Sequence, residues 1–309
     1  MKFKKYFFYL IIPSILLIFV SGYIYFNLDL ILNLLSFSST SILLLFILVF
    51  FSIITRGLIN YLFYFIFSSK LTVIEGIGLA VINSFTNLLP FSGGFFAKGV
   101  YLKHQHDIPY SYYLPATTAL YVSFISINGL IGLICVGFFA LYKGIYLSHW
   151  FYLAFLGMFL SILILYFPLN LKILPKKYKS KIENINLGWH CLWKNPIVLL
   201  QIVFLQIFAI LIVAIRFYVL YNMFSQDILL SHCILISTAT ILTRLVTLVP
   251  GGLGVREGIA ASVGAMLGFD FGISALIATG DRLIEVFMTI FFFTSYTFFY
   301  LAKTDSKRE

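Results

Sequence analysis

The chain has 309 residues, of which 61% are hydrophobic and 10% charged, and its mean hydropathy is +1.02. So few polar residues cannot cover the surface of a soluble domain of this length, and the composition therefore excludes a soluble protein. It predicts an all-α protein that crosses a membrane several times. The excess of Lys and Arg, 21 against 11 acids, gathers in short loops and at the ends, which indicates cytoplasmic segments and no nucleic-acid partner.

Six apolar runs are long enough to cross a bilayer as helices of about 20 residues. In chain order they are residues 6–26, 40–67, 109–142, 150–170, 197–222 and 269–301. The first run is too long for a signal peptide and no small-residue cleavage site follows it, so we expect it to remain as a span. Arg56 and Arg216 lie within the second and fifth runs, and Asp281, Arg282 and Glu285 lie within the last.

Proline and glycine interrupt the apolar sequence in two further regions. One covers about residues 76–108 around Pro90 and Gly94, and the other covers about residues 228–268 around Pro250-Gly251-Gly252. A continuous helix is not expected at either place, because proline lacks an N–H group and glycine weakens a helix. Broken backbone at membrane depth persists only where protein covers it or where it lines a polar cavity. We predict two re-entrant hairpins; for the second, a full crossing by residues 228–249 stays open.

The two interrupted regions fall at corresponding places in the two halves of the chain. A shift of 160 residues takes Arg56 to Arg216 and Pro90 to Pro250. If each hairpin enters and leaves on one face, the three full spans 40–67, 109–142 and 150–170 place the second half upside down. Both termini then lie in the cytoplasm, in agreement with the positive-inside rule. The sequence thus predicts two inverted-topology repeats, an arrangement typical of transporters.

A basic segment separates the two halves. Residues 171–196 contain one acid, Glu183, and six lysines, Lys172, Lys176, Lys177, Lys179, Lys181 and Lys194. We predict a first membrane half at 1–170, this cytoplasmic loop, a second membrane half at 197–302 and a cytoplasmic tail at 303–309. The expected location is the plasma (cell inner) membrane.

Charges near the second interrupted region are the main candidates for a ligand site. Arg256 begins a predicted helix, 255–268, where backbone N–H groups and the helix dipole favour an anion, and its guanidinium adds a forked donor suited to phosphate. Charges inside a membrane are costly and are taken as functional by default. The predicted substrate-binding residues are Arg56, Arg216, Arg244, Pro250, Gly251, Gly252, Gly254, Arg256, Glu257, Asp281, Arg282 and Glu285.

A purely structural role stays open for these charges. Arg256 can pair with Glu257, Asp281 or Glu285 only to hold the hairpin in place. Arg282 and Glu285 are three residues apart on one predicted helix and can form an intrahelical pair.

Other polar residues have plain interpretations. Arg216 is near enough to the outer end of its span to extend its charge to the membrane surface, and Lys98 can simply mark the cytoplasmic surface. His104 and His106 belong to a predicted solvated loop without further metal ligands.

The sequence contains no nucleophile–base pair, metalloprotease motif or P-loop, so we expect no enzyme activity, metal or cofactor. The cysteines, which show no metal or redox spacing, are Cys135, Cys191 and Cys233.

Two motifs carry a family resemblance. Residues Leu248 to Gly258, Leu-Val-Pro-Gly-Gly-Leu-Gly-Val-Arg-Glu-Gly, followed by Ala278-Thr-Gly-Asp-Arg-Leu283, resemble the signature of the flippase-like family, also called the lysylphosphatidylglycerol synthase transmembrane-region family. Asn87 to Gly94 and then Lys98 to Leu102 resemble its first motif, here without the Arg and the acid usually found around its glycine. The resemblance covers nearly the whole chain.

This resemblance implies an integral inner-membrane protein that moves a lipid or lipid-linked headgroup between leaflets. Larger members carry a soluble aminoacyltransferase domain after this region; nothing after Lys303 can form one, so we expect no lipid synthesis here. Aminoacylated lipids, other anionic phospholipids and polyprenyl-phosphate sugars stay open as substrates. The alternatives are a non-transporting partner of a glycosyltransferase or lipid-modifying enzyme, and an intramembrane transferase with Glu257 or Asp281 as base.

Overall fold

The computed structural model describes residues 38–67, 71–88, 93–143, 148–166, 186–240 and 254–305, and these residues form helices and no strand. The first half of the chain forms α3 (Ser39–Phe65), α4 (Val73–Thr86), α5 (Gly93–His106), α6 (Tyr110–Phe138) with the π-helical turn η1 (Phe139–Lys143), and α7 (His149–Leu160) with the 3-10 turn η2 (Ser161–Tyr166). The second half forms α9 (Cys191–Lys194), α10 (Pro196–Met223), α11 (Leu230–Thr240), α12 (Val255–Met266) and α13 (Phe271–Asp305).

Three helices of the described part are long and apolar enough to cross a membrane, namely Ser39–Phe65, Tyr110–Leu141 and Pro196–Met223. They match three of the predicted spans. The last predicted span is covered by α13, and the fourth corresponds to α7 and η2. The first predicted span, 6–26, lies outside the described residues. The prediction of an all-α polytopic membrane protein is confirmed.

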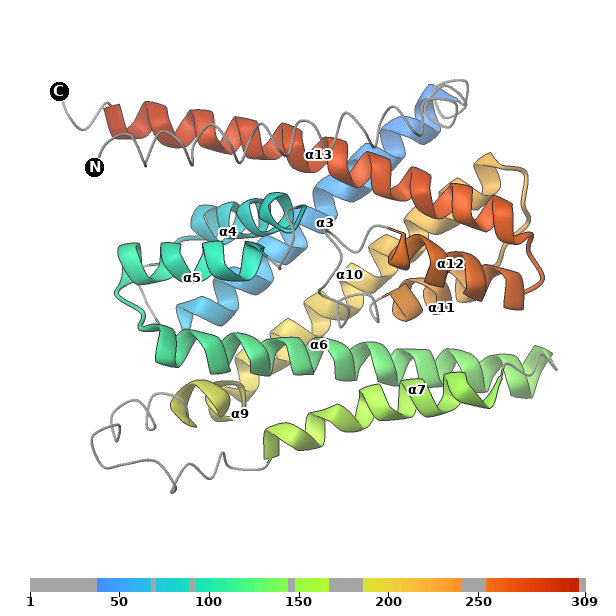
Figure 1. Cartoon of the computed structure of the whole chain (residues 1–309), viewed down its shortest axis with the longest axis horizontal. Helices are drawn as coiled ribbons and strands as arrows, with labels where there is room; N and C mark the ends of the chain where they lie inside the picture. The colour runs from blue at the N-terminus through green and yellow to red at the C-terminus, as the bar shows by residue number, and fades with distance from the viewer. Residues whose placement is uncertain are drawn as a thin grey trace.

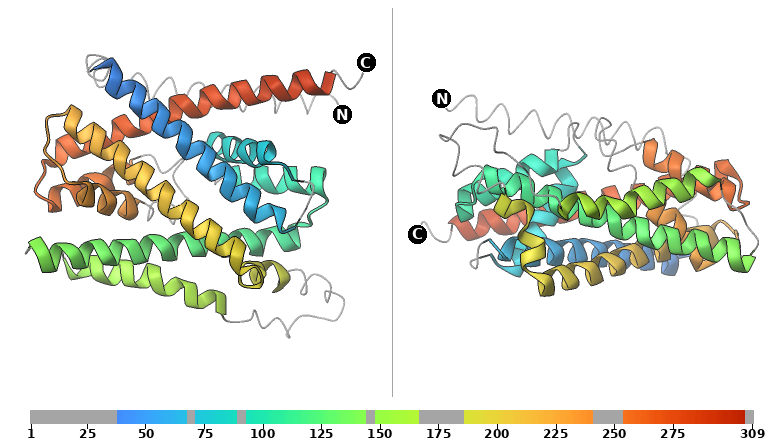
Figure 2. Two further views of the ribbon diagram at one scale, coloured as in Figure 1. Left: turned by 180° about the vertical axis from the view of Figure 1, so that it is seen from behind. Right: turned by 90° about the horizontal axis from the view of Figure 1, so that it is seen from below.

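The long helices form a frame around two shorter helix pairs (Figure 1). Helices α6 and α13 lie along opposite edges and run in opposite directions, while α7 returns along α6. Helices α3 and α10 cross one broad side of the frame diagonally, antiparallel and in contact with each other, as the view from behind shows (Figure 2). The pair α4–α5 lies at the end where α6 begins, and the pair α11–α12 lies at the other end, where α13 begins.

The contacts repeat in the same order in the two halves. α3 packs on α4 as α10 packs on α11, and α13 packs on α4 as α6 packs on α11. This pattern agrees with the predicted shift of 160 residues. How the halves are inserted in a membrane, and whether both helix pairs are re-entrant, stay predictions.

Local sequence explains where the first helix pair begins and how its tip is packed. Thr72 and Glu75 form a capping box: the Glu75 carboxylate accepts the Thr72 N–H at 2.8 Å and the Thr72 hydroxyl accepts the Glu75 N–H at 3.3 Å. The helix therefore starts before residue 76, where the sequence placed the apolar piece. At the tip, a Cβ on Gly94 would lie 2.5 Å from the Asn83 carbonyl oxygen, so α5 can approach α4 only with glycine there.

A left-handed residue opens the last helix of the second pair. Gly254 has φ +80°, a conformation that favours glycine, and Val255 then begins α12. The Glu257 carboxylate accepts the Gly254 N–H at 2.8 Å, which satisfies one of the free donors of the helix start. The observed helix, Val255–Met266, agrees with the predicted 255–268.

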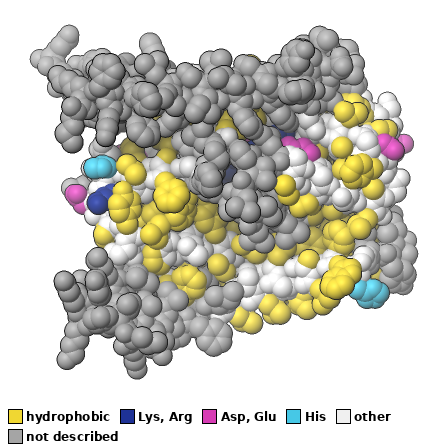
Figure 3. All heavy atoms as spheres, viewed as in Figure 1, with side chains coloured by type: hydrophobic (Ala, Val, Ile, Leu, Met, Phe, Trp, Pro, Cys, Tyr) yellow, Lys and Arg dark blue, Asp and Glu magenta, His cyan; other side chains and the backbone are white. Residues whose placement is uncertain are grey.

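Part of the predicted basic loop is helical. Residues 186–189 form a helical turn and α9 follows, in contact with α6 and α10, and Trp189, Cys191 and Leu192 are buried. Residues 171–185 lie outside the described part. The surface of the described helices is rich in hydrophobic side chains, and few charges are visible among them on the face shown in Figure 3. Such a surface suits a hydrocarbon environment.

Candidate functional site

Two acidic side chains on one face of α13 are the centre of the candidate site. Asp281 and Glu285 are four residues apart, so they lie one helical turn apart on the same side of the helix. Their side chains are only 2% and 12% exposed. Carboxylates so deep in an apolar protein require cationic partners, and α3, α10 and α12 each supply one.

The most deeply buried partner is Arg216 of α10. Its Nε donates to Asp281 Oδ1 at 2.7 Å, its Nη2 lies 2.5 Å from the same oxygen, and the Arg216 side chain is 1% exposed. The expectation that Arg216 extends to the membrane surface is therefore wrong. Because α10 packs on α13, the Arg216 guanidinium pairs with the Asp281 carboxylate inside the protein and does not reach solvent.

Arg256 bridges the two acids from the first turn of α12. Its Nη1 donates to Glu285 Oε2 at 2.7 Å and its Nη2 donates to Asp281 Oδ2 at 3.1 Å. The sequence left three acids open as partners, and the structure selects these two, while Glu257 caps its own helix. The forked guanidinium thus fastens α12 to α13, and its side chain remains 17% exposed.

Two further arginines share Glu285. Arg56 of α3 donates from Nη1 to Glu285 Oε1 at 3.2 Å, and from Nε to the Ser52 carbonyl at 3.3 Å. Arg282 lies 3.5 Å from Glu285 Oε2, which is the predicted i,i+3 pair. Arg56 belongs to the first half of the chain and Glu285 to the second, so this contact joins the two halves.

We refer to these six side chains as the charge network: Arg56, Arg216, Arg256, Arg282, Asp281 and Glu285. They come from four helices and meet beside the start of α12. Their exposure rises from 1% at Arg216 to 26% at Arg56, so the network has a closed side and a more open side. The arrangement can hold an anion against several guanidinium groups at once.

The structure brings together most, but not all, of the predicted site residues. Gly254 and Glu257 support the network by shaping the start of α12. Four predicted residues lie outside the described part of the chain, namely Arg244, Pro250, Gly251 and Gly252.

Lys98 of α5 is a second deeply placed cation, and the expectation that it marks the surface is wrong. It is 3% exposed, and its Nζ lies 6.0 Å from the ring centroids of both Tyr64 and Tyr121. Aromatic rings at this distance attract a cation through their π faces. The sequence shows the lysine but not which of twenty tyrosines would surround it, because those tyrosines come from α3 and α6.

The two histidines of the predicted loop lie in helix α5 instead. His106 Nε2 is 3.4 Å from Glu75 Oε1, which ties the end of α5 to the start of α4. Among the described residues, no group of three or more His, Cys, Asp or Glu side chains could hold a metal ion.

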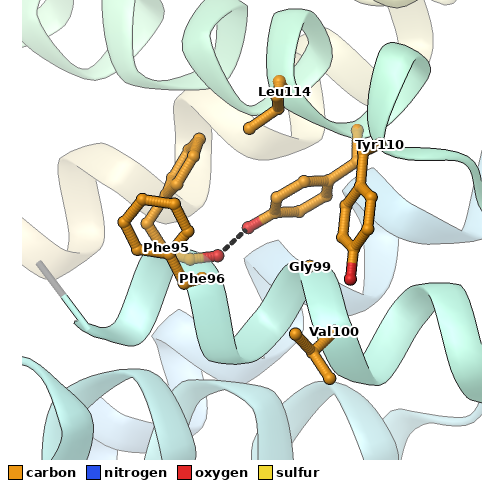
Figure 4. A pocket seen from close by; sticks show the side chains of 7 residues that line it. Phe95, Phe96, Gly99, Val100, Tyr110 and Leu114 are labelled. Atoms are coloured by element: carbon orange, nitrogen blue, oxygen red, sulfur yellow. Dashed lines mark hydrogen bonds between the residues drawn. The ribbon is translucent and has the colours of Figure 1, made fainter.

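A small apolar groove lies between α5 and α6, and no residue of the charge network lines it (Figure 4). It has an empty volume of about 270 Å³, and one wall is fixed by the Tyr113 hydroxyl, which donates to the Phe95 carbonyl at 2.7 Å. The lining residues are Phe95, Phe96, Gly99, Val100, Tyr110, Tyr113 and Leu114. With no charged residue among them, the groove suits hydrocarbon rather than a headgroup.

Fold and site together define an integral membrane protein of packed α-helices with a buried network of arginines and carboxylates. Comparison with known families gives a match to the lysylphosphatidylglycerol synthase TM region over residues 8–292. The chain belongs to this family, which places it among membrane proteins related to lipid handling. Comparisons with curated proteins and with solved structures gave no match.

Proposed function

We propose that this protein moves a lipid or lipid-linked headgroup between the two leaflets of a membrane. The observation that carries the proposal is the charge network, because it places four arginines and two acids together inside a largely apolar helical protein. On insertion scales each such charge costs about 2.5–3.5 kcal/mol at the centre of a membrane helix. A protein that only had to fold would be served as well by apolar packing at these positions.

The position of the network suits alternating access to a headgroup. It lies where the second helix pair meets α13 and where α3 of the first half reaches the second half. A rocking motion of one half against the other would open and close the contact between Arg56 and Glu285 while α12 and α13 stay fastened by Arg256. The headgroup would move through protein, and the acyl chains would stay in lipid.

We further propose that the chain works without catalysis of its own, that it resides in the plasma (cell inner) membrane and that both termini are cytoplasmic. Topology can be tested by labelling single cysteines: residue 93 should react from the cytoplasm and residue 251 from outside. Labelling of both from one face would contradict the inverted arrangement of the two helix pairs.

Transport can be tested with purified protein in liposomes that contain fluorescent phospholipids. We expect accelerated movement of labelled lipid to the opposite leaflet and a loss of roughly tenfold or more in Arg256→Ala, since hydrogen bonds to charged groups contribute about 1.5–3 kcal/mol. Lys103→Ala is the matched control, because this exposed lysine contacts the Tyr110 ring at 4.5 Å outside the network. No movement of any lipid, with Arg256→Ala equal to wild type, would overturn the proposal.

The basic segment motivates a second candidate function, that of a non-transporting partner of a glycosyltransferase or lipid-modifying enzyme. Its six lysines could dock an acidic enzyme surface or anionic headgroups. Reversal of these charges would then abolish activity of the partner, while Arg256→Ala would have no effect.

A further inference from the structure

The charge network contains more positive than negative charge. Four guanidinium groups face two carboxylates, which leaves an excess of two positive charges among the six residues. A further acid on α12, Glu257, reduces the excess to one if it is counted, although one of its oxygens already accepts the Gly254 N–H. Since uncompensated charge in an apolar interior is costly, this network is best completed by an anion.

One donor of the most exposed arginine of the network, Arg56, is left over. The Arg56 Nη2 atom is buried and has no hydrogen-bond partner among the described residues, although Nε and Nη1 of the same guanidinium both donate. Arg56 and Arg256 are the most exposed arginines of the network, at 26% and 17%. A phosphate oxygen could therefore reach both while Arg216 stays paired with Asp281.

Acceptors, in contrast, are already occupied. Both oxygens of Asp281 and both oxygens of Glu285 accept hydrogen bonds from arginines. Glu257 Oε1 is the one buried carboxylate oxygen without a hydrogen-bond partner among the described residues. An ammonium group on a ligand would meet four arginines of like charge and would have to rely on that single oxygen.

We infer that the headgroup held by the charge network is a phosphate with a net charge of minus one or minus two and no cationic substituent. Anionic phospholipids and polyprenyl phosphates belong to this class, whereas an aminoacylated phospholipid such as lysylphosphatidylglycerol does not, because its ammonium groups more than cancel the phosphate charge. This inference rests on the proposed function and names the substrate class of the same site.

The test compares three lipids in vesicles of neutral phosphatidylcholine that contain the purified full-length protein. Phosphatidylglycerol, phosphatidic acid or lysylphosphatidylglycerol is added in equal amounts, and two readouts are taken: the initial rate of transbilayer movement and the lipid-induced rise in Tm. We expect both anionic lipids to move at least about tenfold faster than the lysylated lipid, and only they should raise Tm.

Three variants sharpen the comparison. Arg56→Gln should reduce the preference for anionic lipids, because it removes the unpartnered donor while Glu285 keeps three arginines nearby. Lys103→Gln, which removes a surface charge outside the network, should leave the preference unchanged. Glu257→Gln keeps a residue able to cap α12 but removes a negative charge beside the network, so it should keep or strengthen the preference for anionic lipids.

The outcomes separate the two proposals. Equal or faster movement of the lysylated lipid, or movement of it that depends on Glu257, would overturn the inferred substrate class and leave translocation standing. A rise in Tm with the anionic lipids alone, without movement of any lipid, would overturn translocation and support the class. Equal shifts in Tm with all three lipids would contradict the class by a measurement independent of transport.

Discussion

The contact of α5 with α6 in the first half and the contact of α12 with α13 in the second half occupy corresponding places but differ in chemistry. In the second half, Arg256 holds Glu285 and Asp281 at 2.7 and 3.1 Å. The residues 160 positions earlier than these three are Phe96, Tyr121 and Ile125. Phe96 is 64% exposed and lines the apolar groove. The same arrangement of helices is thus closed by ion pairs in one half and left open and apolar in the other.

This difference in charge between α6 and α13 explains why Arg56 of the first half pairs with an acid of the second half. Arg56 on α3 and Arg216 on α10 occupy corresponding positions, and Arg216 pairs with an acid of its own half. The sequence of α6 contains no acidic residue, so no partner on that helix corresponds to the acids of α13. Arg56 instead contacts Glu285 of the second half at 3.2 Å. Because α6 contains no acidic residue, Arg56 forms an ion pair with the second half and adds to the helix contacts between the halves.

The largest loss of stability is expected at the most deeply buried ion pair of the second half, Arg216 with Asp281. Asp281→Asn removes the charge that Arg216 faces at 2.7 Å, with both side chains at most 2% exposed. Breaking one partner of a buried pair costs about 3–5 kcal/mol, so we expect a comparable fall in the free energy of unfolding. Thermal unfolding of the purified protein in detergent measures it.

A double variant distinguishes charge from packing as the cause. In Arg216→Met/Asp281→Leu both charges are replaced by apolar side chains, and most of the lost stability should return because such replacements are often neutral. If the double variant is as unstable as Asp281→Asn, the unpaired charge of Arg216 is not the source of the loss, which then comes from packing or from the Arg256 contact with the Asp281 carboxylate that both variants lack.

A smaller effect is expected at the contact between the halves. Arg56→Gln and Glu285→Gln, singly and together, form a double-mutant cycle, and we expect a coupling energy of about 0.5–3 kcal/mol because the two side chains touch. The same cycle between Arg56→Gln and Lys103→Gln is the control and should be additive. A coupling energy near zero for Arg56 and Glu285 would show that the halves are not linked through this pair.

The sequence reveals the fold and the members of the site better than it reveals their pairing. Long apolar runs predict the helices because a hydrocarbon environment leaves few other structures, and charges inside those runs mark the site because they are costly there. Which charges pair depends on how each helix is rotated about its axis. An almost uniformly apolar sequence gives little indication of that rotation. Arg216 near a span end and Lys98 after a glycine turn therefore looked like surface charges, although both side chains point inward.

The smallest change in stability is expected in the apolar groove between α5 and α6. The corresponding position on α12 provides the comparison. Val100 is 47% exposed and lines the groove, whereas the residue 160 positions later, Ala260 on α12, is 1% exposed. Val100→Phe should change the free energy of unfolding by no more than about 0.5 kcal/mol, as for other surface substitutions. Ala260→Phe should cost about 1–3 kcal/mol because it overpacks a filled contact. If the two substitutions destabilise the protein equally, the α5–α6 contact is as tightly packed as its counterpart, and the difference between the halves is limited to their charges.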